Sequence, residues 1–126
     1  NPVKVYLMDT GFSLLGGSVS SNLGRLLENV VALEFYRNRR NAFYHKDVNE
    51  CDFILTDGMR PVEACQVCWE LSNANEKREL DGLNEAMRKF RIKKGYILTY
   101  NQEETRKING KSIRFIPVWK WLLEIG

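Results

Sequence analysis

The chain has 126 residues and a mass of 14.7 kDa, which is enough for one domain with a hydrophobic core and too little for two. Apolar residues make up 44% and charged residues 28%, with three prolines and nine glycines, and this composition excludes disordered and collagen-like proteins. The formal net charge of +3 indicates no particular partner. No apolar run approaches the roughly 18 residues of a membrane span, and the start lacks a signal-peptide pattern, so we expect a cytoplasmic protein with no membrane partner.

The N-terminal third predicts a strand followed by a helix. Residues 1–12 are an apolar strand that ends in a turn signal, Asp9-Thr10-Gly11. Asn22 is placed to cap a helix that runs to about Arg39, because apolar residues recur at three- and four-residue spacings from Leu23 onward.

The middle of the chain changes to β-rich runs. They cover residues 42–46, 51–56 and 60–69, and they are rich in β-branched and aromatic side chains. The dipeptide Asp57-Gly58 between the last two runs is a strong hairpin signal.

The remainder predicts a helix, two strands and a terminal helix. The helix covers residues 73–91, and the nearly continuous apolar strand 95–100 is expected to be central in the sheet. Asn109-Gly110 turns the chain into strand 111–116, and Pro117 opens the last helix. We therefore expect one α/β domain over residues 1–126, with helices on the faces of a mixed sheet.

The Asp57-Gly58 hairpin predicts a candidate metal site on its two strands. If these two residues form the whole loop, Asp52 lies opposite Glu63, with Cβ atoms about 4.5–5.5 Å apart. Like charges in that position repel each other, and a divalent cation such as Mg²⁺ or Mn²⁺ would remove the repulsion. Because alternate residues of a strand share a face, Cys65 is expected on the same side as Glu63.

A third carboxylate lies on the first helix. Glu28 shares a helical face with Val31, Ala32 and Phe35, so it is expected beside apolar side chains rather than in water. The alternative interpretation is purely structural: the hairpin register could slip, both strand carboxylates could face water, and Glu28 could pair with Arg25.

Several segments carry a resemblance to a known family. They are Lys4–Gly11, Gly24–Val31, Glu50–Ile54, Val62-Glu63 and Ile116–Trp121. In this order they resemble the C-terminal domain that follows the ATPase module of archaeal-type AAA ATPases. That domain is similar to the restriction-endonuclease-like, or PD-(D/E)XK, nuclease fold, so the resemblance implies an N-terminal ATPase domain as partner.

The nuclease pattern implies roles for individual residues. Glu28 would be the helical acid, and Asp52 and Glu63 would hold Mg²⁺ or Mn²⁺ for phosphodiester cleavage of DNA. The superfamily has a lysine two places after the strand acid, but this chain has Cys65 there. Gln66 could orient a water if a bulge turned it inward, and Lys46 could supply a cation from the neighbouring strand. The departure leaves two hypotheses open, a nuclease and an inactive interaction module that docks the ATPase domain, DNA or another copy.

Basic residues gather near the C-terminal ends of the two long helices. Helix dipoles explain part of this pattern, and a rim that contacts nucleic-acid phosphates is the functional alternative. The candidate contacts are Arg37, Arg39, Arg40, Lys46, Arg88, Lys93 and Lys94. The chain lacks the P-loop pattern, so we expect no ATP site in it.

The Cys65-x-x-Cys68 spacing and His45 also invite a zinc hypothesis. On a strand the two thiols would face opposite sides, so buried free cysteines and a hydrogen-bonded structural histidine are the preferred interpretation.

Overall fold

The computed structural model describes residues 19–125, and the predicted strand over residues 1–12 lies outside them. The described part is an α/β domain with one six-stranded mixed sheet and three helices. The elements are α2 (Val19–Arg37), β1 (Asn41–Lys46), β2 (Glu50–Asp57), β3 (Arg60–Val67), α3 (Glu76–Lys89), β4 (Lys94–Thr99), β5 (Glu104–Ile108), β6 (Lys111–Pro117) and α4 (Val118–Ile125).

The strand order in the sheet is β1-β2-β3-β4-β6-β5. Strands β1, β2 and β3 form an antiparallel meander, β3, β4 and β6 run parallel, and β5 returns antiparallel to β6. Parallel neighbours need a crossover, and α3 supplies the one between β3 and β4.

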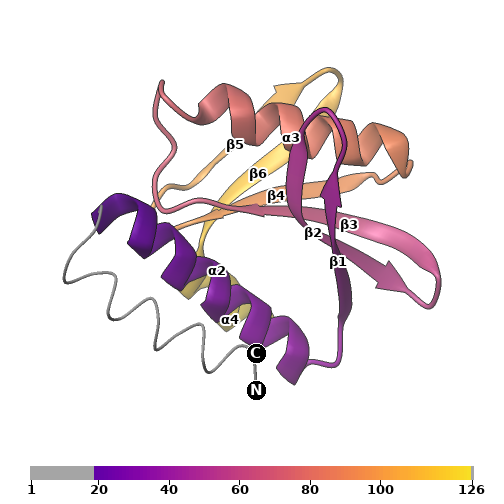
Figure 1. Cartoon of the computed structure of the whole chain (residues 1–126), viewed down its shortest axis with the longest axis horizontal. Coiled ribbons are helices and arrows are strands. Elements are labelled where there is room, and N and C mark those ends of the chain that lie inside the picture. Colours follow the sequence, from indigo (N-terminus) through magenta and orange to yellow (C-terminus); the bar gives the residue numbers. More distant parts are fainter. Residues whose placement is uncertain (1–18, 126) are drawn as a thin grey trace.

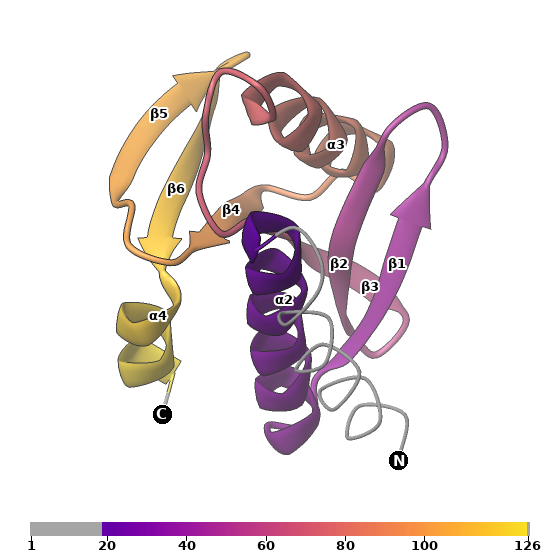
Figure 2. The same ribbon diagram turned by 60° about the vertical axis from the view of Figure 1, so that its left-hand side comes forward.

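The helices cover both faces of the sheet, as Figures 1 and 2 show. Helix α3 packs on one face through Leu83, Ala86 and Met87, which recur at helical spacing. Helices α2 and α4 share the other face, where the Phe35 and Trp121 rings meet edge to face at 5.3 Å. Burial of apolar side chains on both faces therefore holds the mixed sheet between two helical layers.

Strand β4 is central, as its apolar run predicted. Five of its six residues, from Gly95 to Thr99, are buried, and β3 and β6 flank it. Ile97 faces the α3 side while Tyr96 and Leu98 face the α2 side, which is the alternation expected of a strand covered on both faces.

The β2–β3 hairpin forms where predicted, but the predicted register is wrong. Asp57 pairs with Arg60, so the loop consists of Gly58 and Met59, and a further shift occurs between Leu55 and Thr56. As a result Glu63 pairs with Leu55 instead of Asp52. The predicted opposition of Asp52 and Glu63 does not occur, because an irregular ladder moves every later partner.

Three further predictions differ in detail from the structure. Helix α2 begins at Val19, so Asn22 lies inside it and is not its cap. Strand β5 was not predicted, since its five residues are mostly charged or polar and mostly exposed. Pro117 ends β6 instead of opening α4, which begins at Val118.

The structural interpretation of the histidine and the cysteines is confirmed. His45 is buried, and its Nε2 lies 2.9 Å from Oε2 of Glu85. All three cysteines are free and buried, with Cys65 on the α2 face and Cys68 on the α3 face. The thiols of Cys65 and Cys68 therefore belong to opposite faces of the sheet, as the alternation of a strand predicts.

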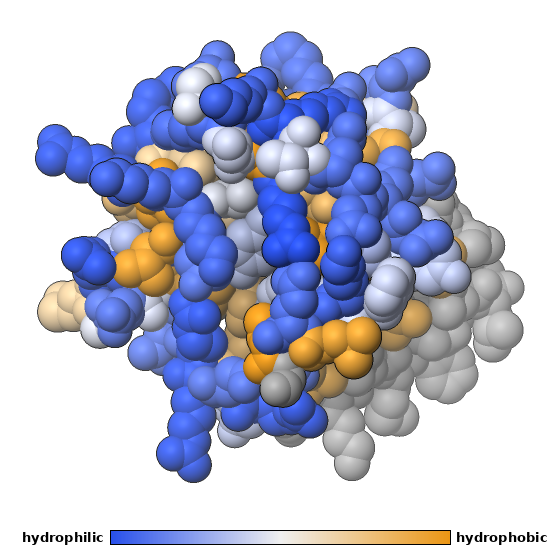
Figure 3. All heavy atoms as spheres, turned by 180° about the vertical axis from the view of Figure 1, so that it is seen from behind, coloured by the Kyte–Doolittle hydropathy of each residue, from blue (hydrophilic) through white to orange (hydrophobic). Residues whose placement is uncertain are grey.

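The described surface is mainly polar. Figure 3 shows one face, covered largely by hydrophilic side chains with small groups of hydrophobic ones between them. Within residues 19–125, no helix is both long enough and apolar enough to cross a membrane.

Candidate functional site

A pocket of about 670 Å³ opens where β3 ends, beside the N-terminal parts of α2 and α3. Ligands of α/β sheets bind preferentially outside the carboxyl ends of parallel strands, and this pocket lies beyond the end of β3. Its acidic lining comes from α2, β2 and α3, and we call it the acidic pocket for its three half-buried carboxyl groups, Glu28, Asp52 and Glu79.

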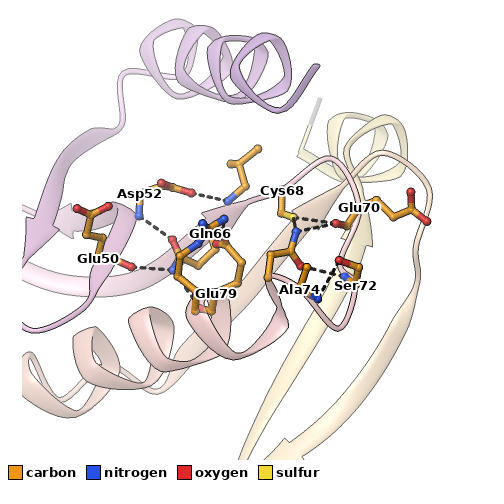
Figure 4. Close-up of polar contacts among 11 residues, drawn as sticks. Glu50, Asp52, Gln66, Cys68, Glu70, Ser72, Ala74 and Glu79 are labelled. Atoms are coloured by element: carbon orange, nitrogen blue, oxygen red, sulfur yellow. Dashed lines mark hydrogen bonds and ion pairs between the residues drawn. The ribbon is translucent and has the colours of Figure 1, made fainter. Parts of the chain in front are cut away.

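Backbone and side-chain hydrogen bonds fix Asp52 at the wall of this pocket. Its Oδ2 accepts a hydrogen bond from the backbone N–H of Val67 at 2.8 Å. Its own N–H donates to Oε1 of Gln66, also at 2.8 Å. Figure 4 shows Asp52 held in this way between the ends of β2 and β3.

Gln66 ties the same region to α3. The side-chain amide of this buried residue donates to the carbonyl of Glu50 at 2.8 Å and to the carbonyl of Glu79 at 3.0 Å. Figure 4 shows the Gln66 side chain between Glu50, Asp52 and Glu79. Both N–H donors and one lone pair of its oxygen are therefore engaged by backbone groups, which gives Gln66 a structural role in connecting β2, β3 and α3.

The three carboxyl groups of the pocket are hard to ionise. Burial, and then the charges of Asp52 and Glu79, raise the pKa of Glu28 to about 7. Burial and the charge of Asp52 raise the pKa of Glu79 to about 7, and burial raises the pKa of Asp52 to about 6. Arg25 and Arg78 also line the pocket and oppose these shifts without cancelling them.

The carboxyl groups of the acidic pocket are the ligands that the resemblance implies for a metal. Carboxylate oxygens suit Mg²⁺ or Mn²⁺. Yet within residues 19–125 no three His, Cys, Asp or Glu side chains lie close enough together to hold a metal ion. One Asp52 oxygen is also occupied by the Val67 N–H. In this arrangement the carboxyl groups share a pocket but do not form a metal site, and Mg²⁺ or Mn²⁺ binding stays a prediction.

Neither Cys65 nor Lys46 supplies a charge in place of the missing lysine, and the cations among the described lining residues of the acidic pocket are Arg25 and Arg78. Burial raises the pKa of Cys65 well above its ordinary value and that of Cys68 to about 11, so both are neutral thiols near pH 7. Cys65 lies in the core on the α2 face. Lys46 pairs with the exposed Glu50 at 3.5 Å and does not line the acidic pocket.

Glu63 lies outside the acidic pocket, among basic side chains. Its carboxylate accepts hydrogen bonds from Arg40 at 2.8 Å and from the Tyr96 hydroxyl at 3.0 Å, and Lys94 lies 3.7 Å away. Burial alone would raise the pKa of Glu63, but these partners lower it on balance. Asp52 and Glu63 therefore line separate pockets, and the pairing predicted for a shared metal is wrong.

The predicted basic residues divide into two groups. Arg39, Arg40, Lys93 and Lys94 line adjoining pockets around the start of β3, at the end away from the acidic pocket. Glu63 beside Lys94 lies four residues before Val67 on β3, which corresponds to about 13 Å. The other predicted contacts lie outside these pockets: Arg37, which pairs with Glu34, Lys46, which pairs with Glu50, and Arg88, which is exposed near the end of α3.

Two kinds of site residue were missed from the sequence. Glu79 shares a helical face with the buried Gly82, Leu83 and Ala86, the same pattern that identified Glu28 on its helix, so the signal was present. Arg60 joins the cations around the start of β3 only through the fold, whereas Arg91 is one of the basic residues that the sequence placed near the end of the second long helix.

Comparisons with known proteins give one relative. No family model matches the chain. It is 37% identical over 133 aligned residues to an uncharacterized protein of Methanocaldococcus jannaschii, MJ1544, and the alignment covers 95% of this chain. The chain spans 29% of the length of MJ1544, so the similarity concerns only part of that protein.

Proposed function

We propose that this domain binds nucleic acid through its basic end and keeps the nuclease-like arrangement without a preformed catalytic centre. The basic end consists of six cationic side chains: Arg39, Arg40, Arg60, Arg91, Lys93 and Lys94. The observation that carries the proposal is their excess over carboxylates, because the described residues that line these three pockets include three carboxylates, Asp57, Glu63 and Glu124. Clustered cations that bind phosphates give salt-dependent affinity for nucleic acid.

The way both long helices end supports a role for these arginines. Helix α2 ends with the N–H of Arg40 bonded to the carbonyl of Phe35, and Arg39 adopts a left-handed φ of 56°. Helix α3 ends in the same way, with Ile92 bonded to Met87 and Arg91 at a φ of 54°. Glycine is the usual residue at such a helix end, because other side chains are strained there. Arginine at both helix ends therefore favours a binding role for Arg39 and Arg91, since it does not favour stability.

Replacement of both arginines by glycine tests the proposal. Arg39→Gly with Arg91→Gly should keep or slightly raise the melting temperature, because strain is relieved. The same variant should lose affinity for a 20-base-pair duplex, measured by fluorescence anisotropy at several salt concentrations. The slope of log K against log salt should fall by roughly two, since each lost phosphate contact removes about one.

The matched control removes a cation that lies outside the basic end. Lys77 is highly exposed at the start of α3 and pairs with Asp81, so Lys77→Gln should leave both affinity and salt slope unchanged. Salt-independent or absent binding by the wild-type protein would refute the proposal. An unchanged slope in the double variant would do so too.

A metal-dependent phosphodiesterase is the second candidate function. The raised pKa values of Glu28, Asp52 and Glu79 favour it, because a bound divalent cation would relieve the mutual repulsion of these groups. Calorimetric titration with Mn²⁺ and plasmid nicking test it with Asp52→Asn and Glu79→Gln, and Glu63→Gln serves as control. If this candidate holds, Asp52→Asn and Glu79→Gln lose Mn²⁺ binding and plasmid nicking, and Glu63→Gln keeps both. Equal nicking by the wild type and Asp52→Asn would exclude it.

The expected partners follow from the same resemblance. We propose that an N-terminal ATPase domain and a second copy of the domain are docking partners, in keeping with the much greater length of the relative. Light scattering of the isolated domain measures self-association directly. A cytoplasmic location likewise stays a proposal.

A further inference from the structure

A second pocket, of about 540 Å³, lies on the α2 and α4 side of the sheet near the starts of β4 and β6. We call it the aromatic pocket. Four buried side chains line it, Phe35 from α2, Tyr96 from β4, Ile116 from β6 and Trp121 from α4. They belong to one hydrophobic cluster in which the Phe35 and Trp121 rings meet edge to face, so the inner wall of the pocket is apolar and largely aromatic.

The rim of this pocket carries an excess of positive charge. Among the lining residues are four cations and the carboxylates Glu63 and Glu124. Glu63 is engaged by Arg40 and Lys94, and Glu124 is held by Arg114 through two hydrogen bonds of 2.7 and 3.2 Å. Within the described part of the chain, Lys93 has no carboxylate within ion-pair distance. Lys93 is therefore the group left to neutralise a ligand.

We propose that the aromatic pocket binds a small ligand with an aromatic body and one anionic group, a function beyond nucleic-acid binding at a pocket that shares Arg40, Lys93 and Lys94 with the basic end. The apolar body lies against Tyr96 and Trp121, and the anion meets Lys93 at the rim. Pockets of 300–1,000 Å³ with an apolar wall and a few convergent polar groups are typical of small-molecule sites. A nucleoside monophosphate and an aromatic carboxylate both have this chemistry.

The strand geometry provides a variant that fills the pocket without touching its charges. Ser112 is exposed on β6 and lines the pocket together with Arg114 and Ile116, which lie at alternate positions of the same strand. A larger side chain at this position points into the pocket. Ser112→Trp therefore occludes it, while Met59→Trp adds the same indole to an exposed hairpin loop as a control.

The test is a fluorescence titration with 1-anilinonaphthalene-8-sulfonate, an aromatic anion. Wild-type protein and Met59→Trp should bind it saturably with equal affinity, and Ser112→Trp should bind at least tenfold more weakly. Lys93→Ala should weaken binding about fivefold, the equivalent of about 1 kcal/mol. The uncharged probe N-phenyl-1-naphthylamine should be weakened by Ser112→Trp and unaffected by Lys93→Ala.

Displacement distinguishes the two sources of ligand. Release of the probe by dAMP identifies a nucleotide site, and release by salicylate alone identifies an aromatic carboxylate site. Release by neither, absence of saturable binding, or full affinity in both Ser112→Trp and Lys93→Ala would overturn the proposal. Arg39 and Arg91 do not line the aromatic pocket, so the double glycine variant that loses duplex affinity should bind the probe as the wild type does, and this proposal and the nucleic-acid proposal can fail separately.

Discussion

The three carboxyl groups of the acidic pocket should make the stability of the domain depend on pH. The pKa values of Glu28, Asp52 and Glu79 are higher in the folded domain, at about 7, 6 and 7, than their ordinary values. The native state therefore binds more protons than the unfolded chain between about pH 4 and 7, and these groups lower the free energy of unfolding as pH rises through that window.

Asp52→Asn should reduce this dependence, because it removes one titrating group and the repulsion that Glu28 and Glu79 feel from it. Urea denaturation at pH 5 and pH 7.5 measures the effect: the fall in stability should be clearly smaller in the variant. Glu63→Gln is the control, since the lowered pKa of Glu63 affects stability only as pH falls below about 4.5. An equal fall in the wild type and Asp52→Asn would contradict the prediction.

Gln66 should be among the most sensitive polar residues of the domain. Its amide bonds two backbone carbonyls and one N–H that connect β2, β3 and α3. Gln66→Met keeps the approximate volume but leaves these buried groups unpaired, so we expect a loss of about 3 kcal/mol in the free energy of unfolding. Urea denaturation followed by circular dichroism measures this loss, and a value below about 1 kcal/mol would show that Gln66 is dispensable.

At the scale of elements, the close approach of α3 to β2 depends on a missing side chain. A Cβ at Gly82 would lie 1.8 Å from the carbonyl oxygen of Glu50 and 2.6 Å from Nε2 of Gln66. Gly82→Ala should therefore push α3 away from the strand end and destabilise the domain by about 3 kcal/mol.

Gly24 provides a matched control within α2. Among the described residues outside its own helix turn, a Cβ there would meet no atom within 4 Å, so Gly24→Ala should stabilise the domain by about 0.5–1 kcal/mol through helix propensity. Thermal melts of the two variants should shift in opposite directions. A neutral Gly82→Ala would mean that α3 can move without loss.

Most helices and strands could be predicted from the sequence, but their exact pairing could not. Turn dipeptides and apolar periodicity predicted α2, α3 and the hairpin strands, because these signals are local. The same signals could not predict that Gly58 and Met59 form the loop or that a bulge follows at Leu55, and the two shifts together replaced the expected partner of Asp52 by the region of Gln66. The family resemblance implied one site for Glu28 and Asp52, and both line the acidic pocket, whereas the gathering of Arg60 with Lys93 required the fold itself.

At the scale of the whole molecule, the sheet joins two hydrophobic clusters. Cys51 and Cys68 belong to the cluster under α3, and Cys65 belongs to the cluster under α2 and α4. Neighbouring residues of the same strands build both clusters, so neither face can lose its packing while the sheet stays ordered. The described part of the domain should therefore unfold as one cooperative unit.

Thiol labelling tests this cooperativity because the three cysteines report on both faces. All are buried, and burial raises the pKa of Cys51 to about 12, so native protein should react negligibly with a thiol reagent. Labelling in a urea series, with the modified cysteine identified by mass spectrometry, should give the same midpoint for Cys51, Cys65 and Cys68. That midpoint should match the one from circular dichroism. Earlier labelling of Cys65 would instead show that the face under α2 and α4 opens first, before α3 leaves the sheet.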